Sequence, residues 1–421
     1  MDTIGQRIKK LRNEQSLTLK QVAGEELSAA MVSLIENDKT TPSVNTLTYI
    51  ANKLGVDISY FIDKYTKEDL KKIIRDLTQL LEDSNEKNLI KAVNRLKGMV
   101  DNLGNNFEAA RIHEIYARCL YFLYRDYGYN KNDWETYAKK AKNIYMQLQM
   151  THRSLKVDFF LAKIQEENQN YNRTLELVDK VLNNYQLEME EYEVCGVILD
   201  FMLLKINTLS GMGYITEALK LLEEAIQYSK NNMVFSHLYQ LHNNSAFLLY
   251  NEGRISEAQD HLAYTQKLYD LTENDTLYAE MICMGIHYKE FFENEIDLAF
   301  NLIEEFERKL PYLNLLNEDI RTSYYNYLSE FKARCYTKIN CPEKALLYFK
   351  DFNNKKYYSQ HPLDISIREI TFSYRALCYK ELKDWGKAKK NAEKSVEKLR
   401  FFPHTKYYEF AKDVVRMVGN K

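Results

Sequence analysis

A small residue recurs through much of the chain, each time three positions after an aromatic residue, an isoleucine or a proline. The six pairs are Tyr171 with Thr174, Ile215 with Ala218, Ile255 with Ala258, Ile296 with Ala299, Pro342 with Ala345 and Trp385 with Ala388. Successive small residues are about 44, 40, 41, 46 and 43 positions apart. This period is typical of a solenoid of helical hairpins, in which each unit buries a face against its neighbours. The small residue allows the second helix of each unit to approach the first closely.

The units match the tetratricopeptide pattern, with helices longer than in its roughly 34-residue consensus. Gly213 and Gly253 each lie five positions before an alanine, where that pattern has its turn glycine. An earlier, degenerate unit includes Trp134, Ala138 and Ala141. We therefore expect residues 85–421 to form about seven hairpins that coil into a right-handed superhelix, rather than an irregular stack of helices.

The first 65 residues predict a small domain of five short helices. Side chains suited to start the helices are Thr3 with Gln6, Thr18 with Gln21, Ser28, Pro42-Ser43 and Asp57. Apolar residues at helical spacing predict the core, namely Ile4, Ile8, Leu11, Val22, Ala23, Val32, Ile35, Leu47, Ile50 and Leu54. Gly55 is suited to end the fourth helix. The stretch from Thr66 to Glu82 is amphipathic and predicts a linker helix.

This segment resembles the Xre/lambda-repressor-type helix-turn-helix domain, in the version found in PlcR-like regulators. Those regulators are peptide-pheromone receptors of the RRNPP group. The residues that carry the resemblance are Leu17-Thr18, Ala23, Val32-Ser33-x-Ile35-Glu36-Asn37, Pro42-Ser43 and Ile50-Ala51-x-Lys53-Leu54. The resemblance implies an all-α protein with a helix-turn-helix DNA-binding domain at residues 1–65 and a linker helix at 66–84. Residues 85–421 would then be a repeat domain for peptide binding and dimerisation.

The expected DNA-binding face departs from the family in two respects. The predicted helix that starts at Thr18 has Leu19 where the family commonly has a glutamine. The predicted helix that starts at Ser28 exposes no arginine, asparagine or glutamine that could reach a guanine or adenine edge. Base reading would then depend on Ser33, on apolar contact with thymine methyl groups or on DNA shape. The expected DNA contacts are Arg7, Lys10, Arg12, Thr18, Lys20, Ser28, Ala29, Ala30, Met31, Ser33 and Lys39. The alternative is a domain that keeps this fold and acts in dimerisation without tight DNA binding.

A tetratricopeptide superhelix lines its concave groove with the first helix of each unit, and such a groove suits an extended peptide. The side chains expected there are Lys163, Asn207, Gln240, Asn243, Phe247, Tyr250, Met284, Tyr288, Tyr327, Glu330 and Arg334. The resemblance implies that Asn207 and Asn243 bind the peptide backbone, since an amide both donates and accepts hydrogen bonds. For each aromatic residue in this set, packing between repeats is the competing interpretation.

The composition excludes several classes of protein. A net charge of −2 over 421 residues argues against a globally basic nucleic-acid binder. We find no secretory signal, no lipidation motif and no stretch that we expect to span a membrane. Six scattered cysteines without a C-x-x-C pair indicate buried thiols in a reducing cytoplasm. Phosphate-binding, nucleophile-elbow and zinc-protease motifs are absent from the sequence, so we expect no enzyme activity, no cofactor and no metal.

These observations predict a cytoplasmic quorum-sensing transcription regulator. It would bind double-stranded promoter DNA through the N-terminal domain, as a homodimer, and be switched by a short linear signalling peptide in the repeat groove. The alternative is a protein-binding adaptor or inhibitor, similar to the Rap-type regulators, whose helix-turn-helix domain reads DNA weakly or not at all.

Overall fold

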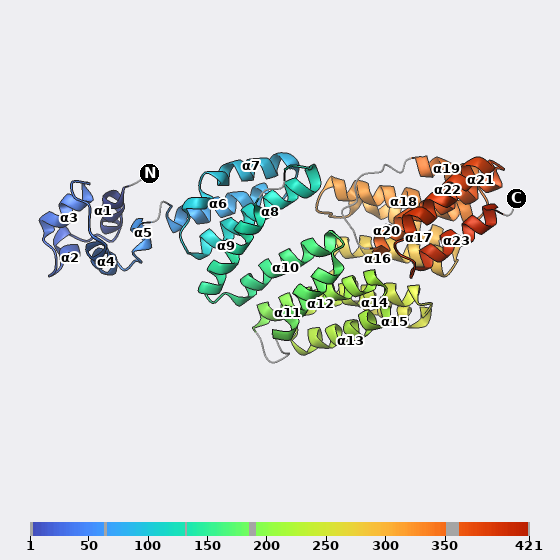
Figure 1. Cartoon of the computed structure of the whole chain (residues 1–421), viewed down its shortest axis with the longest axis horizontal. Helices are drawn as coiled ribbons and strands as arrows, with labels where there is room; N and C mark the ends of the chain where they lie inside the picture. The colour runs from blue at the N-terminus through green and yellow to red at the C-terminus, as the bar shows by residue number, and fades with distance from the viewer. Residues whose placement is uncertain (1–2, 63–64, 131–132, 185–190, 351–361, 420–421) are drawn as a thin grey trace. The chain divides into compact units, whose positions relative to one another are not determined.

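The computed structural model describes residues 3–62, 65–130, 133–184, 191–350 and 362–419 (Figure 1). All regular elements in these ranges are helices, which confirms the predicted all-α class. The chain divides into two compact units, residues 1–158 and 159–421, and the division falls within helix α10 (Thr151–Glu167).

The N-terminal domain consists of five short helices, as predicted. They are α1 (Ile4–Glu14), α2 (Leu19–Ala23), α3 (Ala29–Glu36), α4 (Val44–Lys53) and α5 (Ser59–Ile62). The caps also form as expected: Thr3 with Gln6 and Thr18 with Gln21 make complete capping boxes, and the hydroxyl of Ser28 accepts a hydrogen bond from the amide of Met31. The predicted apolar residues meet in one core, in which Ile8, Val22, Val32 and Ile50 are fully buried.

Close approach of α1 and α3 depends on a glycine. A Cβ atom added at Gly5 would lie 2.0 Å from the carbonyl oxygen of Ile35 and 2.7 Å from a carboxylate oxygen of Asp38. No side chain fits there, so the two helices pack backbone against backbone. This contact fixes α3 against the rest of the domain.

The first unit continues with α6 (Lys67–Leu80), α7 (Glu86–Lys97), a short 3-10 turn (η1, Val100–Asn102), α8 (Phe107–Tyr127) and α9 (Trp134–Gln147). Helix α6 begins at a capping box between Thr66 and Asp69 and buries Leu70 and Leu77. It packs against α7 and α8, and α8 pairs with α9. The segment predicted as a linker helix is therefore itself packed on the next helices of the chain.

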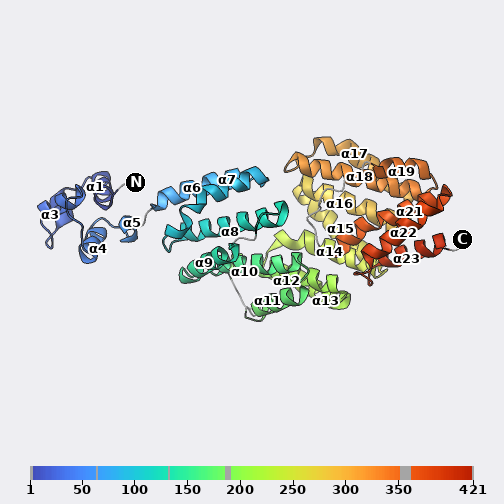
Figure 2. The ribbon, with the colours of Figure 1, turned by 45° about the horizontal axis from the view of Figure 1, so that its top comes forward.

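The second unit is a series of paired helices (Figure 2). The first helices of the pairs are α12 (Tyr192–Met212), α14 (Leu238–Asn251), α16 (Asp275–His287), α18 (Glu318–Lys338) and α21 (Thr371–Glu381). Their partners are α13 (Ile215–Asn231), α15 (Ile255–Thr272), α17 (Ile296–Lys309), α19 (Pro342–Lys350) and α22 (Trp385–Leu399). Helix α11 (Tyr171–Asn184) packs on α12, and the terminal helix α23 (Lys406–Gly419) covers α21 and α22.

The repeated sequence pair marks the start of each second helix. The six small residues predicted to allow close approach, from Thr174 to Ala388, are all fully buried. The predicted turn glycines Gly213 and Gly253 adopt φ values of 88° and 76°, a left-handed conformation that favours glycine. The tetratricopeptide-like repeats are thus confirmed.

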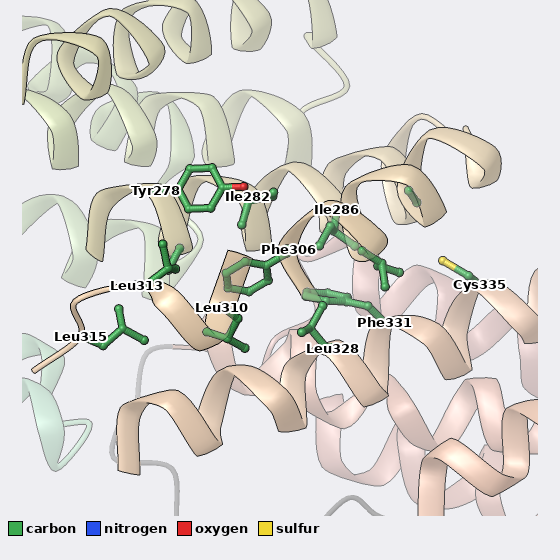
Figure 3. Packing of buried hydrophobic residues seen from close by; sticks show 13 residues of the cluster. Tyr278, Ile282, Ile286, Phe306, Leu310, Leu313, Leu315, Leu328, Phe331 and Cys335 are labelled. Carbon is green, nitrogen blue, oxygen red and sulfur yellow. The ribbon is translucent and has the colours of Figure 1, made fainter. Parts of the chain in front are cut away.

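One hydrophobic cluster in this unit joins α16, α17 and α18 (Figure 3). Ile282 and Ile286 from α16 meet Phe306 from α17 and Leu328 and Phe331 from α18. Phe331 also lines a cavity, together with Cys283, Tyr324 and Tyr327, which pack against this cluster. The cluster therefore provides a rigid wall for that cavity.

Helix α12 requires a correction to the sequence analysis. Its 21 residues are long and apolar enough to cross a membrane, although we expected no such stretch. However, 72% of the most apolar 18-residue stretch of this helix is buried inside the protein. Because helices of the same unit cover it, its apolar character fits a central helix of the repeat core.

Candidate functional site

Helix α3 presents a mostly apolar surface to solvent. Met31 and Leu34 are 40% and 41% exposed, and Ala30 is exposed beside them. The hydroxyl of Ser28 is used as the helix cap, and Ser33 is half-buried. The side-chain amide of Asn37 donates to the Ser33 carbonyl, and its oxygen accepts from Lys9. The polar groups of α3 are thus largely engaged within the domain.

Two of the arginines expected to bind phosphate are instead part of the fold. Arg7 is only 8% exposed and donates a hydrogen bond to the carbonyl of Tyr60. Arg12 donates from Nε and Nη2 to the two carboxylate oxygens of Glu36, at 2.6 and 2.9 Å, and from Nη1 to the carbonyl of Leu17. We therefore remove both arginines from the expected DNA-binding face, because their charges stabilise α1 against α3 and α5.

The cations that remain are lysines. Lys10, Lys20 and Lys39 are exposed, on α1, on α2 and directly after α3. Thr18 caps α2 and also contacts Gln21, so its hydroxyl has a structural use. Leu19, which replaces the family's glutamine, packs against the core of the domain. These placements leave Lys10, Lys20 and Lys39 as the proposed phosphate contacts.

The second unit contains a cavity of about 360 Å³. Its walls come from α14, α16 and α18, the first helices of three successive pairs, and from α20 (Pro362–Glu369). The lining residues are Asn243, Glu280, Cys283, Met284, His287, Tyr324, Tyr327, Glu330, Phe331, Arg334, Asp364, Ile367 and Arg368. This volume lies in the range of small-ligand pockets and can hold one or two peptide side chains.

The structure brings five of the expected peptide-binding residues together in this cavity, namely Asn243, Met284, Tyr327, Glu330 and Arg334. Their sequence separation spans 91 positions, from 243 to 334, so only the repeat fold can place them on one surface. Asn243 is half-buried on α14, where its amide lines the cavity.

The other six expected residues do not line the cavity. The rings of Tyr250 and Tyr288 stack in the core with centroids 4.1 Å apart, and both are 1% exposed, so the expectation that they face a groove is wrong. Phe247 packs against the same core. The remaining three lie elsewhere on the helices: Lys163 pairs with Glu166, Asn207 accepts a hydrogen bond from Asn244, and Gln240 is exposed.

A buried polar network lies behind the cavity. The Arg334 guanidinium contacts Glu290 at 2.5 Å, and neither side chain is exposed. Glu290 also pairs with Lys338 at 3.4 Å and accepts a hydrogen bond from the hydroxyl of Tyr374. The three cationic and aromatic partners come from α18 and α21, while Glu290 belongs to a π-helical turn (η3, Tyr288–Phe292). Within this network the buried carboxylate of Glu290 is thus paired with two cations.

His287 links the cavity to that network. Its Nδ1 lies 3.0 Å from an Arg334 nitrogen, and its Nε2 lies 2.8 Å from the hydroxyl of Tyr407 on α23. Complete burial, together with the positive charges of Arg334 and Lys338, holds the pKa of His287 well below its usual value. The imidazole is therefore neutral at physiological pH, and its Nδ1 accepts a hydrogen bond from Arg334.

Glu330, which lines the cavity, is a second buried carboxylate beside Glu290. It is 4% exposed and accepts a hydrogen bond from the Thr371 hydroxyl at 2.6 Å. Burial raises its pKa, while the positive charge of Arg334 opposes this shift.

Several residues that line the cavity were not predicted from the sequence. Glu280, Cys283 and His287 lie on the same face of α16 as the expected Met284, and their spacing along one helix was a usable signal. Asp364 and Arg368 on α20 carry no comparable signal, because α20 lies outside the repeat register. Within the described residues, no group of three or more His, Cys, Asp or Glu side chains could hold a metal ion.

Comparison with known proteins decides the nature of the N-terminal domain. Residues 5–67 match the family model described as helix-turn-helix domain. This domain is a helix-turn-helix domain. Over 65 residues the chain is also 40% identical to the immunity repressor protein of Bacillus phage phi105, a match that covers 15% of this chain and 45% of that repressor. The chain thus matches less than half the length of the repressor.

Two solved structures resemble this helix-turn-helix protein at a lower level. One is Bacillus thuringiensis PlcR in complex with the peptide PapR7 and DNA, at 20% identity, with 66% of this chain and 98% of that chain covered and a TM-score of 0.37. The other is ComR from S. thermophilus in complex with DNA and its signalling peptide ComS, at 16% identity, with 66% and 97% covered and a TM-score of 0.33. Both superpositions are too weak to support an argument about function.

Proposed function

We propose that this protein is a cytoplasmic transcription regulator that binds promoter DNA and is switched by a short signalling peptide. The observation that carries the proposal is the presence, in one chain, of a helix-turn-helix domain and a repeat array with a mostly apolar cavity. The peptide must bind one state of the protein more tightly than the other, since otherwise no change in DNA affinity results.

The DNA-binding part is supported by the surface of α3 and its surroundings. Three exposed lysines supply charge for phosphate, and a capped helix presents Ala29, Ala30 and Met31 at its N-terminal end, where recognition helices contact bases. One such domain makes few contacts, so we propose a homodimer that binds two half-sites about one helical turn apart.

The peptide-binding part is supported by the cavity. Its wall combines apolar and aromatic surface with the amide of Asn243 and the buried charges of Glu330 and Arg334. Such a mixture suits a peptide, whose side chains need apolar contact and whose backbone needs hydrogen bonds.

The test is fluorescence-polarisation binding of the full-length chain to the DNA upstream of its own gene, over a range of salt concentrations. We expect specific binding that weakens steeply with salt, and about a tenfold or greater loss in a Lys20→Gln, Lys39→Gln double variant. The matched control is Lys398→Gln with Lys412→Gln, which removes the same charge outside the helix-turn-helix domain. Equal binding by both double variants would refute the assigned phosphate contacts.

The apolar exposed face of α3 favours one alternative, a protein-binding adaptor whose helix-turn-helix domain reads no sequence. In that case random duplexes and the upstream DNA would compete equally, with no sequence enriched in selection from a random library. The peptide part is tested by repeating the titration with the synthetic C-terminal peptide of any small open reading frame beside the gene. A peptide-dependent change in DNA affinity is the expected result.

A further inference from the structure

The charges that line the cavity do not balance. Glu330 and Arg334 line the cavity, and Glu290 and Lys338 lie behind them, so these four residues carry two negative and two positive charges. Glu290 contacts Arg334 at 2.5 Å and Lys338 at 3.4 Å. On α20, Asp364 and Arg368 carry opposite charges, and Arg368 also pairs with Glu369 at 3.0 Å. Glu280 on α16 adds a further acid to this lining.

Glu280 has no hydrogen bond and no ion pair with any residue in the described part of the chain. It stays accessible to solvent, so its carboxylate can be reached by a ligand. Its neighbours Tyr239, Cys283 and Tyr324 are uncharged at neutral pH, and a partial loss of hydration beside them raises the pKa of Glu280. A carboxylate in this setting gains stability from a cation that is brought to it.

Aromatic rings next to Glu280 favour the same kind of ligand. Tyr324 and Tyr327, both on α18, line the cavity together with Glu280. The face of an aromatic ring carries partial negative charge and attracts ammonium and guanidinium groups. The two arginines at the cavity add little repulsion. Arg334 is enclosed by Glu290 and by Phe331 and Tyr374, whose ring centres lie 5.6 and 5.1 Å from its guanidinium carbon. Arg368 pairs with Glu369.

Resting on the proposed function, we infer that the peptide places a lysine or arginine side chain in this cavity, with its cationic nitrogen against Glu280 and beside Tyr324 and Tyr327. The stem of such a side chain is apolar and matches the surface of Met284 and Ile367. Asn243 on α14 also lines the cavity, and its amide can bind the peptide backbone.

The experiment uses the full-length chain and a synthetic hexapeptide library with all residues except cysteine randomised. Peptides retained after size-exclusion separation are identified by mass spectrometry. We expect lysine or arginine to be enriched at one position by about tenfold or more. We also expect the Glu280→Gln variant to lose that enrichment and Glu304→Gln to keep it. Glu304 is an exposed acid on α17 that does not line the cavity, so it is a matched charge control.

A second library with acetylated N-termini separates a basic side chain from the terminal ammonium group. Enrichment of lysine or arginine that survives acetylation supports the side-chain assignment, and retention that depends on the free N-terminus overturns it. Peptides retained without a basic preference, or with a preference that Glu280→Gln keeps, overturn this inference alone. If no peptide is retained by the wild-type chain, the peptide-switched function fails and this inference fails with it. Circular dichroism of each variant shows that the fold is intact.

Discussion

Replacing Arg12 with alanine is expected to destabilise the helix-turn-helix domain strongly. The guanidinium makes a bidentate contact with Glu36, whose side chain is 2% exposed, and a hydrogen bond of 2.9 Å with the Leu17 carbonyl. Removing it leaves a buried carboxylate without its counter-charge, at a cost of about 3 kcal/mol. The lost bond to Leu17 adds about 1 kcal/mol.

The assay is hydrogen exchange of the full-length chain, followed in peptides that cover α1 and α3. A loss of about 3–4 kcal/mol corresponds to a protection lower by between two and three orders of magnitude in these peptides. Peptides from the second unit should keep their protection, which serves as an internal control.

The control variant replaces both partners, Arg12→Met with Glu36→Leu. Because it leaves no unpaired buried charge, it should recover most of the protection. Unchanged protection in Arg12→Ala would refute the reasoning, as would a double variant less stable than the single one. If the expected result is obtained, substitutions at Arg12 are unsuitable as probes of DNA contact, since they act on stability first.

Three further predictions rest on a single close contact or on single charges. Gly5→Ala should destabilise the same domain by about 1–3 kcal/mol, because the added Cβ would lie 2.0 Å from the Ile35 carbonyl oxygen. Thermal unfolding that shows the variant to be as stable as the wild type would contradict the backbone contact of α1 and α3. Burial lowers the pKa of both His113 and His242 to about 4. Between pH 6.5 and 4 the unfolded chain therefore binds more protons than the folded chain, and the free energy of unfolding should fall as the pH drops through this window. Urea titrations measure this fall. The loss should be smaller in His242→Gln, and a flat profile would show that both rings stay solvated. Lys20→Gln alone should reduce the salt dependence of DNA binding by a slope of about one, as measured by polarisation.

Features that depend on near neighbours were predictable from the sequence. The capping boxes at Thr3 and Thr18 involve side chains and amides three positions apart, so they can be predicted from neighbouring residues alone. The same holds for the small residue three positions after the first residue of each second helix, since one helical turn brings both to the same face. The repeat therefore predicted the second helices from residue order alone.

The residues of the candidate sites were only partly predictable. Asn243, Met284 and Arg334 were expected in the groove and do line the cavity, because the tetratricopeptide register assigns the inner face of each first helix. Tyr250 and Tyr288 fit the same register but stack in the core, since a large ring gains more from burial than from facing solvent.

The sequence by itself determined the all-α class, the helix-turn-helix domain and the periodic hairpins, because each depends on contacts within one helical turn or on a repeated spacing. Only the tertiary structure decided which charged side chains are available to bind DNA or peptide. Arg12 and Glu36 are 24 positions apart, and their pairing removes a cation from the DNA-binding face. Glu280 has no partner in the described chain because the helices around it bring it uncharged neighbours, and residue order does not encode that environment.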